Sequence, residues 1–276
     1  MKALQISVAL LAALAFAQPA AAQTKGYEPQ VGQAGKDVIW VPTPDEVVER
    51  MLRMAQTTKD DLVYDLGAGD GKIAIAAAKK FGARSVGIEY NPDMARHAQS
   101  NAEKAGVAGR ARIQQGDIFA TDFTQATVVT MYLLPALNLK LRPTILAMRP
   151  GTRVVSHSFT MDDWEPDETS NMDGRRAYFW VVPANVMGNW AVEAGAEKLQ
   201  LSFEQRYQKI EGQVTLSPTM QGGLRDARLR GFAISFSFVD NNGARRDFSG
   251  RVIGQKMEGS FRTEDGKEGR WSAAKK

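Results

Sequence analysis

The sequence predicts an α/β fold with a mainly parallel sheet, followed by a small all-β unit. The first observation is that short apolar runs alternate with helical periods between residues 61 and 182, which is typical of strands joined by helical crossovers. The second is a change of period, because from Leu199 onward apolar residues occupy alternate positions. We therefore expect the second unit to form an antiparallel sheet or a small barrel.

The expected strands of the first unit are its short apolar runs. They are residues 61–66, 85–90, 111–115, 127–133, 152–158 and 177–182. Helices are expected over 71–81, from Asn91 onward with Asn91 as the cap, and over 136–148. An earlier helix is expected after Thr43-Pro44-Asp45-Glu46, where Thr43 would cap the helix and Glu46 would complete a capping box.

The two units predict two domains, residues 37–185 and residues 186–276. Glycines interrupt the alternating runs of the second unit, as turns or bulges do. Its Lys and Arg residues nearly balance its Asp and Glu residues, so this unit is not expected to carry a strong electrostatic field.

The N-terminal residues predict export. Lys2 is followed by an apolar stretch and then by Ala20-Ala21-Ala22, the order found in a cleaved signal peptide. The apolar stretch is shorter than the roughly 20 residues that span a bilayer. We expect residues 1–22 to be a signal peptide, residues 23–36 to be a flexible leader, and the mature protein to be periplasmic with no transmembrane span.

Composition excludes several classes of site. The 276 residues contain no cysteine, which rules out disulfides, thiolate nucleophiles and zinc–thiolate sites. The formal net charge of +4 is too small to indicate a nucleic-acid partner. No His, Asp and Glu residues have convincing metal-ligand spacing, so no metal is predicted. The oligomeric state is not indicated.

A glycine-rich segment, residues 63–73 (VYDLGAGDGKI), connects an expected strand to an expected helix. A Walker A phosphate loop is excluded, because Leu66 and Ile73 stand where that motif needs Gly and Ser or Thr. A dinucleotide loop is disfavoured, because Asp65 and Asp70 would repel a pyrophosphate.

A positively charged ligand reverses that argument, since carboxylates attract an ammonium or a sulfonium group while the glycines allow close approach. S-adenosylmethionine carries both groups. Glu89 ends the next strand, where an acid can accept both ribose hydroxyls. Asp117 follows the third strand, placed to accept from the adenine amino group. Asp70 can alternatively cap the following helix, and Gly116-Asp117 can be a plain turn.

The segments DLGAGDGK, GIEYNP and QQGDIF resemble the first three motifs of class I S-adenosylmethionine-dependent methyltransferases. VPTPDEVVERML, TMYLLP and LRP further resemble the protein-lysine methyltransferase family that includes the ATP-synthase c-subunit lysine methyltransferase and its prokaryotic relatives. The resemblance implies a Rossmann-like methyltransferase domain over 37–185. It also implies cofactor contacts by Asp65, Gly67, Gly69, Glu89 and Asp117, with the segment around Thr43 closing over the site.

The methyl acceptor is expected beyond the end of the fourth strand, at Tyr132-Leu133-Leu134-Pro135. Tyr132 is the candidate for lining the acceptor channel, or it is a core aromatic residue at a strand end. His157 is the candidate base, or it is a hydrogen-bonded structural histidine. The backbone carbonyls of residues 132–134 are candidates for orienting an amine.

The sequence therefore predicts a methyltransferase that uses S-adenosylmethionine. The acceptor is a protein or a small molecule, with a protein lysine favoured on family resemblance and no nucleic acid expected. The alternative is an exported binding protein that keeps the fold and uses its β-domain to hold a partner or an apolar ligand.

Overall fold

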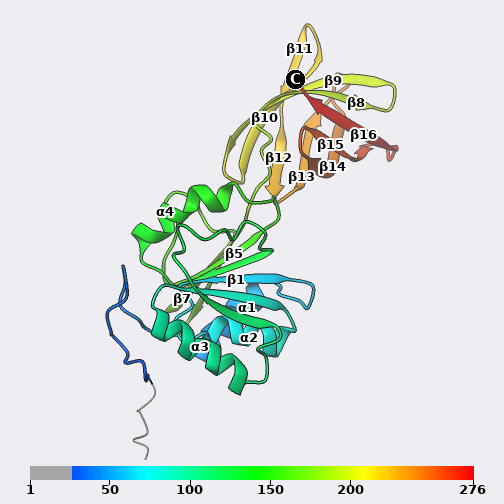
Figure 1. Cartoon of the computed structure of the whole chain (residues 1–276). Helices are drawn as coiled ribbons and strands as arrows, with labels where there is room; N and C mark the ends of the chain where they lie inside the picture. The colour runs from blue at the N-terminus through cyan, green and yellow to red at the C-terminus, as the bar shows by residue number, and fades with distance from the viewer. Residues whose placement is uncertain (1–26) are drawn as a thin grey trace, which may run out of the picture.

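The computed structural model describes residues 27–276, so the expected signal peptide lies outside the described residues. These residues form two sheets, one of seven strands and one of nine. The two sheets follow one another along the chain and lie at opposite ends of the molecule (Figure 1). The predicted fold class is confirmed.

The first sheet is mainly parallel. Its strands are β1 Leu62–Leu66, β2 Arg84–Glu89, β3 Ala111–Gln115, β4 Val128–Met131, β5 Arg153–His157, β6 Glu168–Met172 and β7 Arg175–Val181. Their order is β3-β2-β1-β4-β5-β7-β6, with β7 antiparallel to both β5 and β6. The strand order reverses between β1 and β4, and a crevice forms at such a switch point. Strand β6 is absent from the prediction because its sequence, ETSNM, is polar.

Four helices formed by residues 27–276 cover this sheet. They are α1 Asp45–Met54, α2 Lys72–Phe81, α3 Pro92–Lys104 and α4 Pro135–Leu146. Helices α1, α2 and α3 lie on one face and α4 lies on the other (Figure 1). The side chain of Asn91 caps α3 as predicted, by accepting from the backbone N–H groups of Asp93 and Met94. No helix in the described part of the chain is long and apolar enough to cross a membrane.

The predicted capping box at Thr43 is wrong. Helix α1 begins at Asp45 with Pro44 in the cap position, and no side chain caps it. Thr43 is buried, and its hydroxyl oxygen lies 3.2 Å from Nδ1 of His157. The hydroxyl of Thr43 therefore contacts a residue that is distant in the sequence. The local sequence pattern does not reveal this contact.

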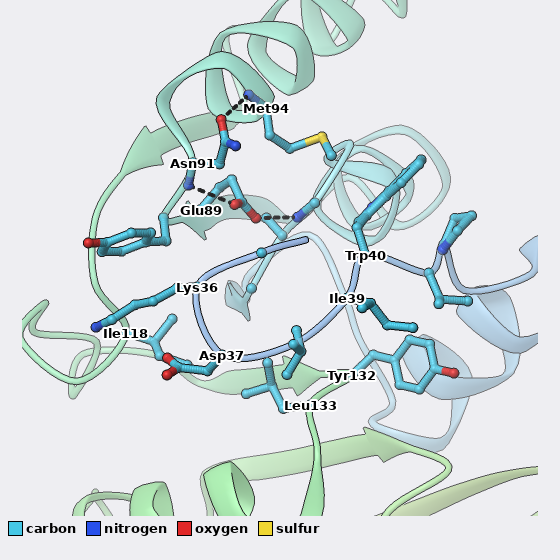
Figure 2. A pocket seen from close by; sticks show the side chains of 18 of the residues that line it. Lys36, Asp37, Ile39, Trp40, Glu89, Asn91, Met94, Ile118, Tyr132 and Leu133 are labelled. Carbon is cyan, nitrogen blue, oxygen red and sulfur yellow. Dashed lines mark hydrogen bonds between the residues drawn. The ribbon is translucent and has the colours of Figure 1, made fainter. Parts of the chain in front are cut away.

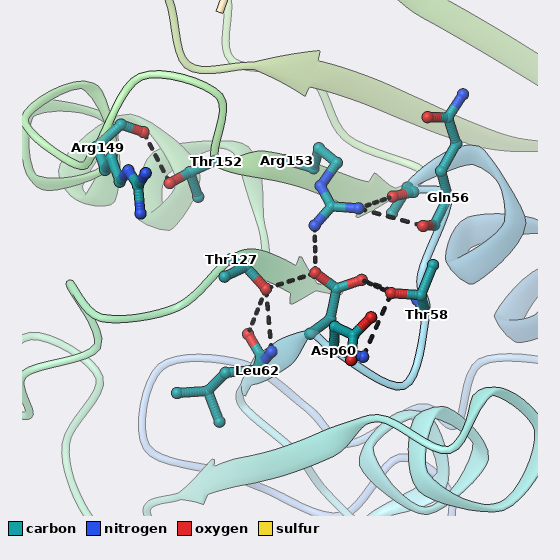
Figure 3. Close-up of polar contacts among 10 residues, drawn as sticks. Gln56, Thr58, Asp60, Leu62, Thr127, Arg149, Thr152 and Arg153 are labelled. Carbon is teal, nitrogen blue, oxygen red and sulfur yellow. Dashed lines mark hydrogen bonds and ion pairs between the residues drawn. The ribbon is translucent and has the colours of Figure 1, made fainter. Parts of the chain in front are cut away.

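A buried charge network ties together the amino ends of the strands (Figure 3). Arg153 donates to the carboxylate of Asp61 and to the carbonyl oxygen of Ala55. Asp61 also accepts from the hydroxyl of Thr127 at 2.7 Å and from the backbone N–H of Thr58 at 2.8 Å. Every oxygen of Asp61 is thus used by the protein itself, as a structural buried charge requires.

The second sheet is antiparallel and curls almost into a barrel. Its strands are β8 Gly188–Ala194, β9 Glu197–Arg206, β10 Lys209–Ser217, β11 Met220–Gly223, β12 Arg225–Arg230, β13 Ala233–Val239, β14 Arg245–Ile253, β15 Lys256–Thr263 and β16 Glu268–Lys275. Their order is β11-β10-β9-β8-β16-β15-β14-β13-β12. The N–H of Leu224, the residue before β12, donates to the carbonyl oxygen of Gly212 in β10. Strand β12, at one edge of the sheet, therefore begins next to β10, near the other edge.

The interior of the second sheet is aromatic. Trp271 packs edge-on against Phe236 and Phe248, with ring centroids 5.7 Å apart in both pairs. A Cβ atom on Gly259 would lie 2.7 Å from the indole nitrogen of Trp271. The glycine that interrupts the alternating pattern therefore makes room for the largest side chain of this core.

Candidate functional site

A cavity of about 340 Å³ lies at the carboxyl ends of β1, β2, β3 and β4. This is the edge of the sheet where ligands bind in open α/β folds. Its walls include the glycine loop after β1, the residues after β2 and β4, and the segment 33–43 before α1. All but one of the predicted site residues line this cavity, and the exception in the described part of the chain is His157.

The glycine loop adopts a backbone that favours glycine. Gly67 and Gly69 have φ values of +77° and +55°, where a side chain is strained. A Cβ on Gly69 would also lie 2.5 Å from Nε1 of Trp40. The loop therefore needs glycine both for its conformation and for the contact with the segment that crosses it.

Asp65 is a buried carboxylate with an unused oxygen. One oxygen accepts from the hydroxyl of Thr130 at 2.8 Å, whereas Oδ2 has no hydrogen-bond partner among the described residues. Burial, together with the nearby charges of Asp70 and Glu89, raises the pKa of Asp65 to about 7. A positively charged ligand group would satisfy the free oxygen and stabilise the ionised form.

Glu89 connects the loop after β2 to the glycine loop. Its two oxygens accept from the backbone N–H groups of Gly69 and Asn91, both at 2.9 Å (Figure 2). Burial raises the pKa of Glu89. Each oxygen keeps a second lone pair, so Glu89 can still accept from two hydroxyl groups of a ligand.

Asp117 is held by a residue that precedes the first helix. Its Oδ2 accepts from Nζ of Lys36 at 2.7 Å, and its Oδ1 accepts from the N–H of Phe119 at 2.9 Å. The hydrogen bond from Lys36 lowers the pKa of Asp117. Lys36 Nζ also lies 4.8 Å from the ring centroid of Tyr90, which is half exposed.

Residues 32–43, here called the strap, form one wall of the cavity. Gly32 and Trp40 are joined by a backbone hydrogen bond of 2.8 Å, and Ala34 bridges to Ile39. In Figure 2 the strap curves across the pocket between Glu89 and Leu133. The sequence predicts a flexible leader up to residue 36, but residues 33–36 line the cavity.

Tyr132 and His157 lie on the other side of the cavity. Their ring centroids are 4.0 Å apart, and the ring of Phe159 is 6.3 Å from that of Tyr132. Burial lowers the pKa of His157 to about 4, so the imidazole is neutral at pH 7. His157 supports Tyr132 and Thr43 from behind and does not line the cavity.

The carbonyl of Leu134 is already used by α4. It accepts from the N–H groups of Leu137 and Asn138 at 3.0 and 3.2 Å. Of the three carbonyls predicted to orient an amine, those of Tyr132 and Leu133 remain as candidates. Phe159, which the sequence did not single out, completes this wall because the end of β5 lies next to the end of β4.

The acceptor groups that line the cavity fit S-adenosylmethionine. Asp65 offers a free buried oxygen to a cationic group, Glu89 offers two acceptors to a ribose, and Asp117 offers an acceptor to an amino group. The cavity volume lies at the lower end of the range for small-molecule sites. Among residues 27–276, no group of three His, Asp or Glu side chains is arranged to hold a metal ion.

Known proteins resemble this region of the chain. Residues 65–168 match the ANTKMT methyltransferase domain. A protein-lysine N-methyltransferase of Saccharolobus islandicus is 49% identical over 151 residues, which are 52% of this chain and 94% of that protein. The ATP-synthase c-subunit lysine N-methyltransferase of Mus musculus is 36% identical over 135 residues, and the match covers 48% of this chain and 53% of the mouse protein.

A solved structure gives the same result for the fold. A Salinibacter ruber chain, described as an RNA methyltransferase in complex with S-adenosyl-L-homocysteine, is 50% identical with a TM-score of 0.52. The match covers 53% of this chain and 96% of the Salinibacter chain. In both prokaryotic comparisons, about half of this chain accounts for nearly the whole relative.

Proposed function

We propose that this chain, which belongs to the ANTKMT methyltransferase domain family of S-adenosylmethionine-dependent methyltransferases, methylates a lysine side chain of a protein. The methyltransferase activity and its cofactor follow from that family. The lysine acceptor is our proposal, and the relative that is 49% identical and named a protein-lysine N-methyltransferase supports it.

The observation that supports placing the cofactor in this cavity is Oδ2 of Asp65, which has no hydrogen-bond partner among residues 27–276. When bound, S-adenosylmethionine would supply a methyl group on a sulfonium, with S-adenosylhomocysteine as the neutral thioether leaving group. Asp65 would hold a cationic part of the cofactor, Glu89 its ribose and Asp117 its adenine. The strap would exclude water from the cavity, which strengthens these interactions.

The acceptor amine would approach from the side of Tyr132 and Phe159. The carbonyl oxygens of Tyr132 and Leu133 can accept hydrogen bonds from the amine and so orient its lone pair. A lysine must lose a proton before it attacks, and the neutral ring of His157 is shielded behind Tyr132. We therefore assign His157 the role of positioning Tyr132 and Thr43, and the lysine gives its proton to bulk water before the amine enters the cavity.

The test uses the mature chain, residues 23–276, with isotopically labelled S-adenosylmethionine and synthetic peptides that each contain one central lysine. Methyl transfer is measured by mass spectrometry. Peptides with arginine in place of lysine and the Asp65→Asn variant serve as controls. We expect transfer only to lysine, and much slower transfer by Asp65→Asn than by the unsubstituted protein.

An RNA arm is included because the Salinibacter relative is described as an RNA methyltransferase. The same assay is run with total RNA in place of peptide. Transfer to RNA without transfer to any lysine peptide would contradict the lysine proposal and leave the methyltransferase assignment standing.

We also propose that the protein is exported to the periplasm, on the signal-peptide pattern of residues 1–22. Mass spectrometry of the protein from a periplasmic fraction should find a mature N-terminus at Gln23. Recovery of the chain with Met1 from the cytosolic fraction would contradict export.

A further inference from the structure

The segment that carries Phe159 contains two strained residues. Ser158 and Asp162 have φ values of +64° and +58°, a conformation that costs a non-glycine residue energy. Such strain persists only where surrounding contacts hold the backbone. Since Phe159 lies between them and lines the cavity, the contacts that hold this segment also fix one wall of the acceptor side.

Helix α4 supplies the first set of contacts. Nδ2 of Asn138 lies 3.4 Å and 3.2 Å from the carbonyl oxygens of Phe159 and Thr160. One turn later, Arg142 donates to the carbonyl oxygen of Met161 at 2.8 Å and to the carboxylate of Asp163. These contacts come from the domain that contains the cavity.

The second sheet supplies the other set, through the turn between β9 and β10. Asp163 accepts from Arg206 at 2.9 Å and from the hydroxyl of Tyr207 at 3.1 Å. Trp164 stacks on Tyr207 with ring centroids 6.0 Å apart, and its indole N–H donates to Gln208 at 3.0 Å. Tyr207 itself has a φ of +55°. The backbone is therefore strained on both sides of this contact, in the segment 158–162 and in the turn between β9 and β10.

The second sheet is additional to the matched family domain, which ends at residue 168. About half of this chain matches 94% of the Saccharolobus protein-lysine N-methyltransferase. That relative therefore has no room for a counterpart of the second sheet. The contact between the second sheet and one wall of the cavity is therefore not needed for methyl transfer itself, and it can serve a purpose specific to this chain.

We propose that Asp163 is a positioning residue through which the second sheet holds Phe159 and thereby selects the methyl acceptor. The cofactor side of the cavity, built from β1, β2 and the strap, does not depend on this contact. This proposal rests on the proposed lysine methyltransferase function, because its main readout is transfer to an acceptor.

The experiment compares Asp163→Ala and Asp163→Asn with the unsubstituted protein. The alanine variant removes the partner of Arg142, Arg206 and Tyr207, and the asparagine variant keeps one acceptor oxygen. Asp265→Ala is the matched control, because Asp265 is an exposed aspartate that pairs with Lys267 in the turn between β15 and β16, away from the cavity. The probe is the lysine peptide that the unsubstituted protein methylates fastest.

We expect Asp163→Ala to lower kcat/KM for the peptide by about tenfold. A misplacement of the acceptor by about 1 Å is enough to cause a loss of that size. The loss should fall on the KM for the peptide, and Asp163→Asn should lie between the alanine variant and the unsubstituted protein. The dissociation constant of S-adenosylhomocysteine, measured by calorimetry, should stay the same in all three variants. Unchanged kcat/KM, or an equal loss in Asp265→Ala, would overturn the proposal.

A second measurement needs no acceptor. Hydrogen–deuterium exchange should become faster in residues 158–164 of Asp163→Ala and stay unchanged in the glycine loop, residues 67–71. If the unsubstituted protein methylates no peptide, the lysine proposal fails and this exchange pattern still decides whether the second sheet holds the segment. Unchanged exchange in residues 158–164 would overturn the inference.

Discussion

The two sheets differ in where their acidic groups lie. In the first sheet, Asp65 is only 2% exposed and keeps an oxygen without a partner in the described structure. In the second sheet, by contrast, Glu268 is exposed and pairs with Arg262. A desolvated carboxylate that the protein leaves unpaired is expensive, whereas an exposed pair costs little.

The presence or absence of a partner distinguishes acidic residues that bind a ligand from acidic residues that stabilise the fold. Asp61 directly precedes β1, the strand that contains Asp65, but it lies at the opposite edge of the sheet, and both its oxygens are used by Arg153, Thr127 and Thr58. Burial alone therefore does not mark a functional acid. Burial together with an unused oxygen does, and in the described part of this chain that combination occurs at Asp65.

The largest expected effect tests whether the second sheet is independent of the cofactor. Trp271→Ala should destabilise the protein by about 3–5 kcal/mol, as truncation of a buried tryptophan does. Affinity for S-adenosylhomocysteine should be unchanged, because Trp271 packs within the second sheet and does not line the cavity. Thermal unfolding and calorimetry measure the two quantities. A loss of affinity below the unfolding temperature would break the separation between the two regions.

The next effect compares glycines with similar backbones. Gly69 in the first region and Gly254 in the second have φ values of +55° and +59°, but only Gly69 has a neighbour within 4 Å of an added Cβ. Both alanine variants should lose about 1 kcal/mol of stability from backbone strain. Gly69→Ala should also weaken cofactor binding by about 100-fold, or about 2.7 kcal/mol, because the added Cβ moves Trp40 and the loop away from the arrangement that lines the cavity.

Equal affinity in Gly69→Ala and Gly254→Ala would contradict the comparison. It would mean that the glycine loop serves the fold and that the contact with Trp40 can relax without cost.

The cofactor side of the site could be predicted because its residues follow a local rule. Gly67, Gly69, Glu89 and Asp117 each lie at or just after the end of a strand, and parallel strands bring those ends together. The positions could therefore be placed from the order of elements alone. Their roles in binding stay predictions until a ligand is measured.

The other walls depend on contacts between distant parts of the chain. The pairing of Lys36 with Asp117 spans 81 residues, and that of Thr43 with His157 spans 114. Neither leaves a periodic or spacing signal, and the local pattern around Thr43 predicts a capping box that does not form. The contact of Asp163 with Tyr207 is invisible for the same reason, since it joins two domains.

The third prediction uses the pKa of Asp65. Because its folded pKa of about 7 lies above the ordinary value of 3.8, the free protein loses stability as the pH rises from 4 to 7. Affinity for the cofactor changes in the opposite direction and rises with pH, because a cationic ligand needs the ionised form of Asp65. Affinity should rise about fivefold between pH 6 and pH 7, as the ionised fraction grows.

Calorimetric titrations at several pH values measure this slope. Asp65→Asn should bind more weakly and lose the slope, whereas Asp61→Asn should keep it, because Asp61 is paired within the protein at the other edge of the sheet. A slope that persists in Asp65→Asn would assign the titration to another group.

The smallest effect concerns Lys36, whose pairing with Asp117 is partly exposed. Each oxygen of Asp117 has a lone pair to spare, so the carboxylate can hold Lys36 and an adenine amino group together. Lys36→Met should therefore loosen the strap and speed the release of S-adenosylhomocysteine about two- to threefold, the size expected for a surface pair. Lys267→Met removes a surface pair in the turn between β15 and β16 and should leave release unchanged. Slower release from Lys36→Met would show instead that Lys36 competes with the cofactor for Asp117, and the strap would then oppose binding.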